Sequence, residues 1–136
     1  MPPPHTELRN RWRLTGHARR IEYSIGRLST PLAGWVVVPV YDSQLTPDAF
    51  GDLEWFRKLE QQEILHGIST ELTHQPTVET RNRKRLRPNR LAEWELRIRE
   101  FRVFYDVYPQ TGTVKIEAVG RKRGSQLFIR GEEYEL

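Results

Sequence analysis

The sequence predicts one α+β domain in which a strand and two helices precede a three-stranded antiparallel meander. Two patterns lead to this prediction. Apolar residues between positions 50 and 72 follow helical spacing, whereas apolar and polar residues alternate between positions 94 and 119. The length of 136 residues suits a single core. One face of the meander should therefore pack on the helices, and the other face should meet water or a ligand.

The first strand is expected at Trp35–Tyr41, a Val-rich run flanked by Gly34 and Asp42. Pro39 favours an edge position or a bulge, because proline donates no backbone hydrogen bond. Residues 1–34 show no sustained apolar period. We therefore expect residues 1–34 to be a flexible extension that folding does not need, or the product of a start codon assigned too far upstream. The domain is expected at residues 35–136.

Two helices are expected at 47–60 and 61–74. Thr46 suits the N-cap of the first helix, and Pro47 suits its first turn because its missing N–H would have no partner there. Asp48 complements the positive end of the helix dipole.

A long loop is expected at 76–92, because this segment is basic and has no apolar period. The strands of the meander should then occupy 94–98, 101–107 and 114–119. Arg99 and Glu100 make the tight first connection, and Pro109–Gly112 makes the hairpin turn of the second. The face away from the helices should present Arg97, Arg99, Arg102 and Lys115.

The positive charge is clustered. The net charge is +4, and residues 81–102 hold nine Lys or Arg against three acids. A second basic group is Arg121–Arg123, while the last residues are acidic. A plain solvated surface is the alternative, but two basic groups in a small fold favour a polyanion such as nucleic acid, or an acidic protein partner.

Other classes of protein are disfavoured. The chain has no cysteine, which removes disulfides, thiolate metal sites and cysteine nucleophiles. The longest apolar run, Trp35–Val38, is far shorter than the roughly 20 residues of a membrane span. The start lacks the pattern of a secretion signal. His66 and His74 lack ligand spacing, so we predict no metal and no other cofactor.

Four short sequence motifs occur in the order and with the spacing that a known family shows. They are Asp52–Phe56, Leu91–Ile98, Phe101–Val107 and Val119–Arg123. Through these motifs the chain resembles the RelE/ParE toxin superfamily over about residues 35–130. The resemblance implies a RelE/ParE-like fold, with an N-terminal strand, a two-helix hairpin and a three-stranded antiparallel meander in one sheet packed on the helices. It also implies a cytoplasmic toxin encoded beside a cognate antitoxin.

The activity implied by the resemblance has more than one form. The leading hypothesis is a metal-independent mRNA endoribonuclease, acting at the ribosome by attack of the RNA 2′-hydroxyl on the adjacent phosphate. The alternatives are a ParE-like gyrase inhibitor and a degenerate member that keeps only antitoxin binding. Contact with operator DNA is expected only through the antitoxin.

The resemblance assigns catalytic roles to Arg97, Arg102 and Lys122. Arginine suits a phosphate site because its planar guanidinium binds two oxygens at once. In the structural alternative, Arg102 pairs with Glu100 or Glu117. The expected RNA-binding residues are Arg83, Lys84, Arg85, Arg99, Arg121 and Arg123.

The chain departs from the family pattern at two positions. Phe128 stands where a catalytic tyrosine is expected, and phenylalanine transfers no proton. Tyr134 could replace that tyrosine if the C-terminal tail folds back. Glu95 stands where such proteins often carry lysine. Core packing, rather than a base-stacking platform, is expected for the periodic aromatics Trp55, Phe56, Trp94 and Phe101.

Overall fold

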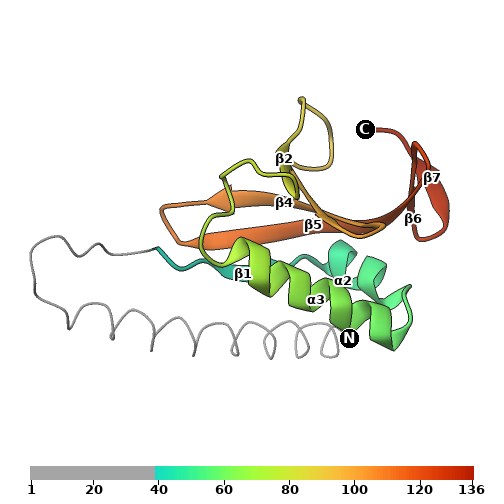
Figure 1. Ribbon diagram of the computed structural model, residues 1–136, viewed down its shortest axis with the longest axis horizontal. Helices are drawn as coiled ribbons and strands as arrows, with labels where there is room; N and C mark the ends of the chain where they lie inside the picture. Colours follow the sequence, from blue (N-terminus) through green and yellow to red (C-terminus); the bar gives the residue numbers. More distant parts are fainter. Residues whose placement is uncertain (1–38) are drawn as a thin grey trace, which may run out of the picture.

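The computed structural model describes residues 39–136 of the chain (Figure 1). The predicted extension, residues 1–34, and most of the predicted first strand lie outside these residues. Within the described part, the strand prediction is wrong for residues 39–41, and the first strand begins at Asp42. The backbone N–H of Tyr41 donates to the carbonyl of Thr73 at 2.7 Å, so Tyr41 is bound to the end of a helix instead of to a strand.

Two helices and seven strands make up the described part. In chain order they are β1 (Asp42–Leu45), α2 (Pro47–Glu54), α3 (Lys58–Leu72), β2 (Arg83–Arg85), β3 (Trp94–Ile98), β4 (Phe101–Tyr108), β5 (Thr113–Arg123), β6 (Gln126–Ile129) and β7 (Glu132–Tyr134). One sheet joins all strands in the order β2-β3-β4-β5-β6-β7. Strand β1 lies parallel beside the first half of β5. The α+β class and the antiparallel meander are confirmed.

The helix starts follow the sequence signals, but the break between the helices does not. Thr46 caps α2, and its hydroxyl accepts a hydrogen bond from the backbone N–H of Ala49 at 3.0 Å. The break lies at residues 55–57, not between 60 and 61. There Phe56 turns into the core, and the Glu60 carboxylate accepts the backbone N–H of Arg57 at 3.1 Å. This bond caps the start of α3.

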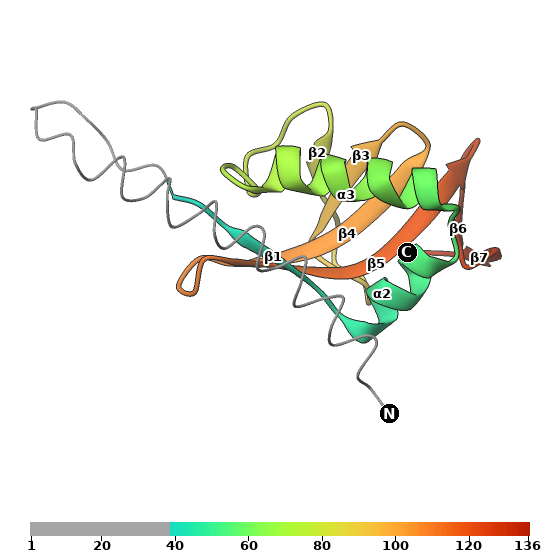
Figure 2. The ribbon, with the colours of Figure 1, turned by 90° about the horizontal axis from the view of Figure 1, so that it is seen from below.

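Both helices cover one face of the sheet. Helix α2 packs mainly on β5, and α3 lies across β3 and β4 (Figure 2). The main core between these layers holds apolar residues from both helices and from the central strands, including Ile64, Ile68, Leu96, Val103 and Ile116. The alternation of the meander therefore sets which face is buried, as predicted.

Several strands were not predicted. Strand β2 lies inside the expected loop, and β6 and β7 follow the last expected strand. The pairing of β4 with β5 also skips Glu117, where a bulge separates the pairs Phe104–Ala118 and Tyr105–Ile116. At this bulge, β5 reverses which of its alternate residues face the helices.

Candidate nucleic-acid interface

The face of the sheet turned away from the helices, here called the outer face, carries a second small core. Phe104, Ala118 and Leu127 are buried on it. Leu91 from the segment before β3 and Tyr134 from β7 pack against them. In Figure 1 this segment and the C-terminal strands both rise on the side opposite the helices. The sheet thus has a covered apolar centre on its outer face, and polar residues lie beside it.

Strand register brings the three predicted catalytic residues together. Arg97 pairs directly with Arg102, and Arg102 pairs with Gly120. Lys122 lies two residues beyond Gly120, so it points to the same face. Lys84 joins them, because its pairing partner Glu95 lies on this face. We call Lys84, Arg97, Arg102 and Lys122 the outer-face cations.

Glu95 is buried among these cations and pairs with two of them. Its carboxylate lies 3.4 Å from Nε of Arg97 and 3.7 Å from Nε of Arg102. The partner predicted for Arg102, Glu100 or Glu117, is therefore wrong, although Arg102 does form an ion pair.

Arg102 is also less accessible than a solvent-facing strand position would be. Its side chain is 15% exposed. One terminal nitrogen donates to the carbonyls of Arg99 and Phe101, at 2.7 and 2.9 Å. Burial lowers the pKa of Arg102, the charge of Glu95 opposes this shift, and the charge of Arg97 adds to it. This guanidinium is held in place before any ligand arrives.

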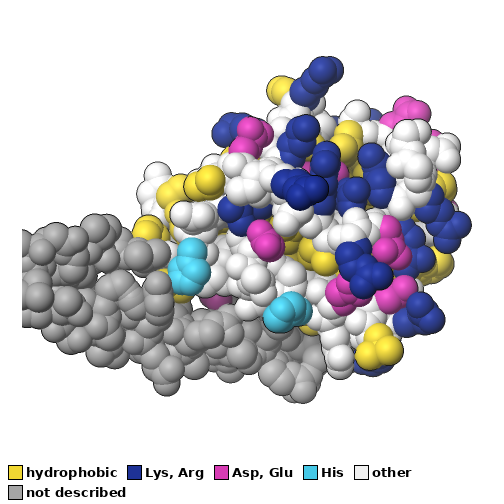
Figure 3. Space-filling view, in the orientation of Figure 1, with side chains coloured by type: hydrophobic (Ala, Val, Ile, Leu, Met, Phe, Trp, Pro, Cys, Tyr) yellow, Lys and Arg dark blue, Asp and Glu magenta, His cyan; other side chains and the backbone are white. Residues whose placement is uncertain are grey.

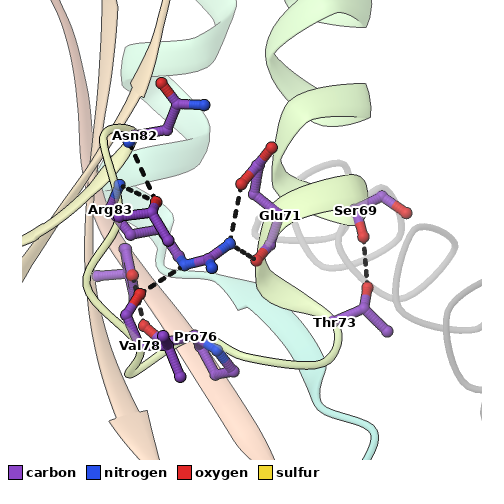
Figure 4. Close-up of polar contacts among 9 residues, drawn as sticks. Ser69, Glu71, Thr73, Pro76, Val78, Asn82 and Arg83 are labelled. Atoms are coloured by element: carbon purple, nitrogen blue, oxygen red, sulfur yellow. Dashed lines mark hydrogen bonds and ion pairs between the residues drawn. The ribbon is translucent and has the colours of Figure 1, made fainter.

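Arg83 is part of the scaffold. It is buried, and its guanidinium donates to the carboxylate of Glu71 at 2.8 Å and to the carbonyl of Val78 at 2.9 Å (Figure 4). Nearby, the hydroxyl of Tyr105 donates to the carbonyl of Pro76 at 2.6 Å. Burial raises the pKa of Tyr105 above its usual range. These bonds fix the chain between α3 and β2.

Three other predicted RNA-binding arginines lie on the helix side of the sheet. Arg99 has a positive φ of 57° and pairs with Glu63 of α3 at 3.3 Å, so the expectation that it points to the outer face is wrong. Arg121 pairs with Glu60 of α3 at 2.8 Å. Arg123 lines a pocket beside the helices. Alternation within one basic run therefore distributes its charges to both faces.

Arg85 is exposed at the edge of the sheet. Its guanidinium lies 5.8 Å from the ring centroid of Trp94 and 4.0 Å from the carboxylate of Glu93. In the space-filling view, Lys and Arg side chains spread over the upper and right-hand parts of the described surface (Figure 3). The surface charge is thus broad, and the outer-face cations are one part of it.

The C-terminal tail folds back as β7. Phe128 pairs with Arg121 and lines the same helix-side pocket, so it does not face the outer-face cations. Leu127 pairs with Lys122 on one side and with Tyr134 on the other. Tyr134 therefore lies on the outer face, in the cross-strand row that contains Lys122.

Sequence reasoning missed the roles of Asp52 and Arg130. Asp52 is buried, and its carboxylate accepts the backbone N–H of Val119 at 3.1 Å and Nε of Arg130 at 2.7 Å. Burial raises the pKa of Asp52, and these two bonds oppose the shift. No local pattern could reveal this contact, because Arg130 is 78 residues from Asp52.

Within residues 39–136, no three histidines, cysteines or carboxylates gather as a metal-ion site would require. No helix in this part of the chain has the length and apolar character to cross a membrane.

No protein-family model matches the sequence, and no curated protein matches it. Among solved structures, the fold is similar to a chain of the crystal structure of the RelBE2 toxin–antitoxin complex from Mycobacterium tuberculosis. The TM-score is 0.54 at 22% sequence identity, over 64% of this chain and 95% of the other.

The chain has a RelE-like fold. The predicted architecture is thereby confirmed at the level of fold. Because a fold hosts many functions, the activity must be argued from the outer face.

Proposed function

We propose that the protein is the toxin of a toxin–antitoxin pair and that its outer face binds and cleaves mRNA. The observation that carries this proposal is the convergence of Arg97, Arg102 and Lys122 on one face of a RelE-like fold. Three cations within two neighbouring strand pairs form a suitable site for a phosphodiester. RNA is preferred over DNA as substrate because RNA carries its own nucleophile, the 2′-hydroxyl.

The reaction needs charge stabilisation more than it needs a cofactor. The 2′-oxygen attacks phosphorus while the bond from phosphorus to the 5′-oxygen breaks, which leaves a cyclic phosphate and a 5′-hydroxyl. The phosphoryl oxygens gain negative charge in the transition state. Arg102, already fixed by Glu95 and two backbone carbonyls, offsets this charge without reorganising.

Arg97 and Lys122 complete the contact with the phosphate in this proposal. The hydroxyl of Tyr134 is the proton donor for the departing 5′-oxygen, and the proton of the 2′-hydroxyl passes to water. Lys84 binds a phosphate further along the strand. The remaining predicted RNA-binding residues are assigned to the scaffold, the sheet edge or the helix side.

One observation favours a second candidate, a protein that binds a target without cleaving RNA. Glu95 sits between Arg97 and Arg102 and cancels part of their charge. A gyrase inhibitor or a degenerate toxin would tolerate this carboxylate more easily than a nuclease. In each case the partner is a cognate antitoxin, and operator DNA is contacted through it. The nuclease acts in the cytoplasm, with mRNA on the ribosome.

The test is induced expression in cells, with growth, transcript 5′ ends and plasmid supercoiling measured together. Lys122→Met and Arg102→Ala should each lower transcript cleavage by about 100- to 1,000-fold, as when one donor to a developing oxyanion is removed. Lys58→Met, an exposed charge on α3, is the matched control and should cleave as wild type does. Co-expression of the adjacent gene product should restore growth.

Thermal unfolding separates chemistry from folding in this test. Lys122→Met should unfold as wild type does, whereas Arg102→Ala should lose stability because Glu95 stays buried with one partner fewer. Cleavage that survives Lys122→Met would exclude the proposed site. Altered supercoiling without transcript cleavage would support the gyrase alternative.

A further inference from the structure

A pocket of about 440 Å³ lies on the helix side of the sheet, at the end away from the Pro109–Gly112 turn between β4 and β5. Its lining residues come from the link between α2 and α3, from the start of α3, from the end of β5, and from β6 and the turn that follows it. Figure 2 shows the ribbon of the α2–α3 link close to β6 and β7. Its lining is Trp55, Phe56, Arg57, Glu60, Arg121, Arg123, Phe128, Arg130 and Gly131. We call it the link pocket. The outer-face cations do not line it.

The fold leaves one aromatic side chain of the link pocket largely uncovered. Trp55 is 61% exposed, so the prediction that it packs in the core is wrong. The indole lies directly against Gly131, since a Cβ there would be 2.9 Å from Cζ2 of Trp55. An exposed aromatic ring in the wall of a pocket is the kind of surface that binds a partner.

The charge at the link pocket is positive, because four arginines and one glutamate line it. Arg121 is paired with Glu60 and lies 5.4 Å from the ring centroids of Phe56 and Phe101. Arg130 is paired with Asp52. Arg123 is exposed, and the side chain of Arg57 is 86% exposed although it contacts Glu60. These two arginines can each meet an incoming carboxylate.

We propose that the link pocket docks an acidic segment of a partner protein, which places an apolar side chain against Trp55 and carboxylates against Arg57 and Arg123. Charge complementarity supports this occupant. The chain's own first 38 residues have the wrong charge, with six arginines and two glutamates. RNA fits less well, because Glu60 lines the pocket and its carboxylate repels phosphate groups.

The experiment uses the full chain and a panel of fluorescent peptides that combine glutamates with one leucine, phenylalanine or tryptophan. Binding is followed by fluorescence anisotropy, with an oligouridine as the RNA probe. At least one peptide should bind, and its version with glutamine for glutamate should not. Arg123→Glu should weaken that binding by at least about tenfold, through the loss of a charge-assisted contact. Trp55→Ala should weaken it as well.

Lys84→Glu is the matched charge reversal on the outer face. Lys84→Glu should leave peptide binding unchanged and weaken oligouridine binding. Arg123→Glu should weaken peptide binding and leave oligouridine binding unchanged. Failure of the nuclease proposal would appear in the oligouridine measurement alone. The docking proposal is overturned if no peptide binds, if Lys84→Glu weakens the peptide equally, or if Arg123→Glu and Trp55→Ala weaken only the RNA. Unchanged thermal midpoints are required of all three variants.

Discussion

At the scale of single residues, Glu60 holds the helices against the end of the sheet. Its carboxylate accepts hydrogen bonds from the side chain and the backbone of Arg57, and it pairs with Arg121 of β5. Arg121 in turn lies beside the rings of Phe56 and Phe101. One side chain thereby connects the start of α3, the α2–α3 link and the strand that continues towards the C-terminus.

Glu60→Gln should lower stability in a pH-dependent way. The Arg57 side chain, then the Arg57 backbone N–H, and then the charge of Arg121 lower the pKa of Glu60 from 4.5, while burial opposes them. The carboxylate therefore stabilises the fold above its unfolded pKa, and this contribution is lost as pH falls through the folded pKa. At pH 7 the variant should lose up to about 1 kcal/mol, because glutamine still accepts the Arg57 N–H but no longer carries the charge that pairs with Arg57 and Arg121.

Thermal unfolding from pH 7 down to pH 3 checks this expectation. The gap between wild type and Glu60→Gln should close as the pH falls below about 4.5. Glu63→Gln on the same helix, whose partner Arg99 is mostly exposed, is the control and should show a small gap throughout. A gap of constant size would mean that the charge of Glu60 contributes nothing.

Residue-level prediction succeeded where alternation alone decides direction. Arg97 and Arg102 lie in the middle of the meander, and both point to the outer face as expected. Arg99 does not, because the tight turn requires a positive φ at its position and alternation ends there. The ion pair of Glu95 with Arg102 could not be read from the sequence, because it depends on cross-strand register, which spacing along the chain does not report. Arg97, by contrast, lies two residues from Glu95 on the same face of β3.

At the scale of elements, the predictable parts are those with strong local signals. Thr46 and Pro47 marked the start of α2, and the alternation marked β3, β4 and most of β5. Strands β2, β6 and β7 are only three or four residues long, and β2 reads Arg-Lys-Arg. Such segments become strands because a neighbouring edge supplies hydrogen-bond partners, which is tertiary information.

The hairpin of β6 and β7 should detach when Arg130 is removed. Arg130 lies in its turn and reaches Asp52 of α2, and its second terminal nitrogen donates to the carbonyl of Asp48 at 3.0 Å. In Arg130→Met, the Asp52 carboxylate stays buried with one donor fewer. This should cost roughly 1–3 kcal/mol.

Hydrogen exchange by mass spectrometry locates this loss. Exchange should rise in β6 and β7 and stay unchanged in β3 and β4. Arg123→Met, an exposed arginine just before the hairpin, serves as the control. A uniform rise over the whole sheet would show that Arg130 supports global folding and not the attachment of one element.

At the scale of the whole molecule, the described residues 39–136 form one sheet with two helices on one of its faces. The buried residues of the described part run from Asp42 to Leu127. The boundary between residues 34 and 35 stays a prediction. Removing residues 1–34 should leave the thermal midpoint within about 3 °C, since the deleted part supplies no periodic apolar face.

Circular dichroism melts of the full chain and the shortened chain measure this directly. A shorter deletion, of residues 1–17, is the control for a general effect of chain length. If the shortened chain fails to fold while the control folds normally, the domain begins earlier than the sequence indicates.

The position of β1 beside β5 limits when the chain can fold during its translation. The hydroxyl of Thr46, next to β1, donates to the carbonyl of Glu117, which lies 71 residues later. At about 5–20 residues per second, a ribosome needs roughly 4–14 s to make the intervening chain. Until then α2 has no β5 to pack on. The nascent polypeptide therefore cannot complete its sheet until β5 has been made, and any activity that depends on the finished fold is withheld until then.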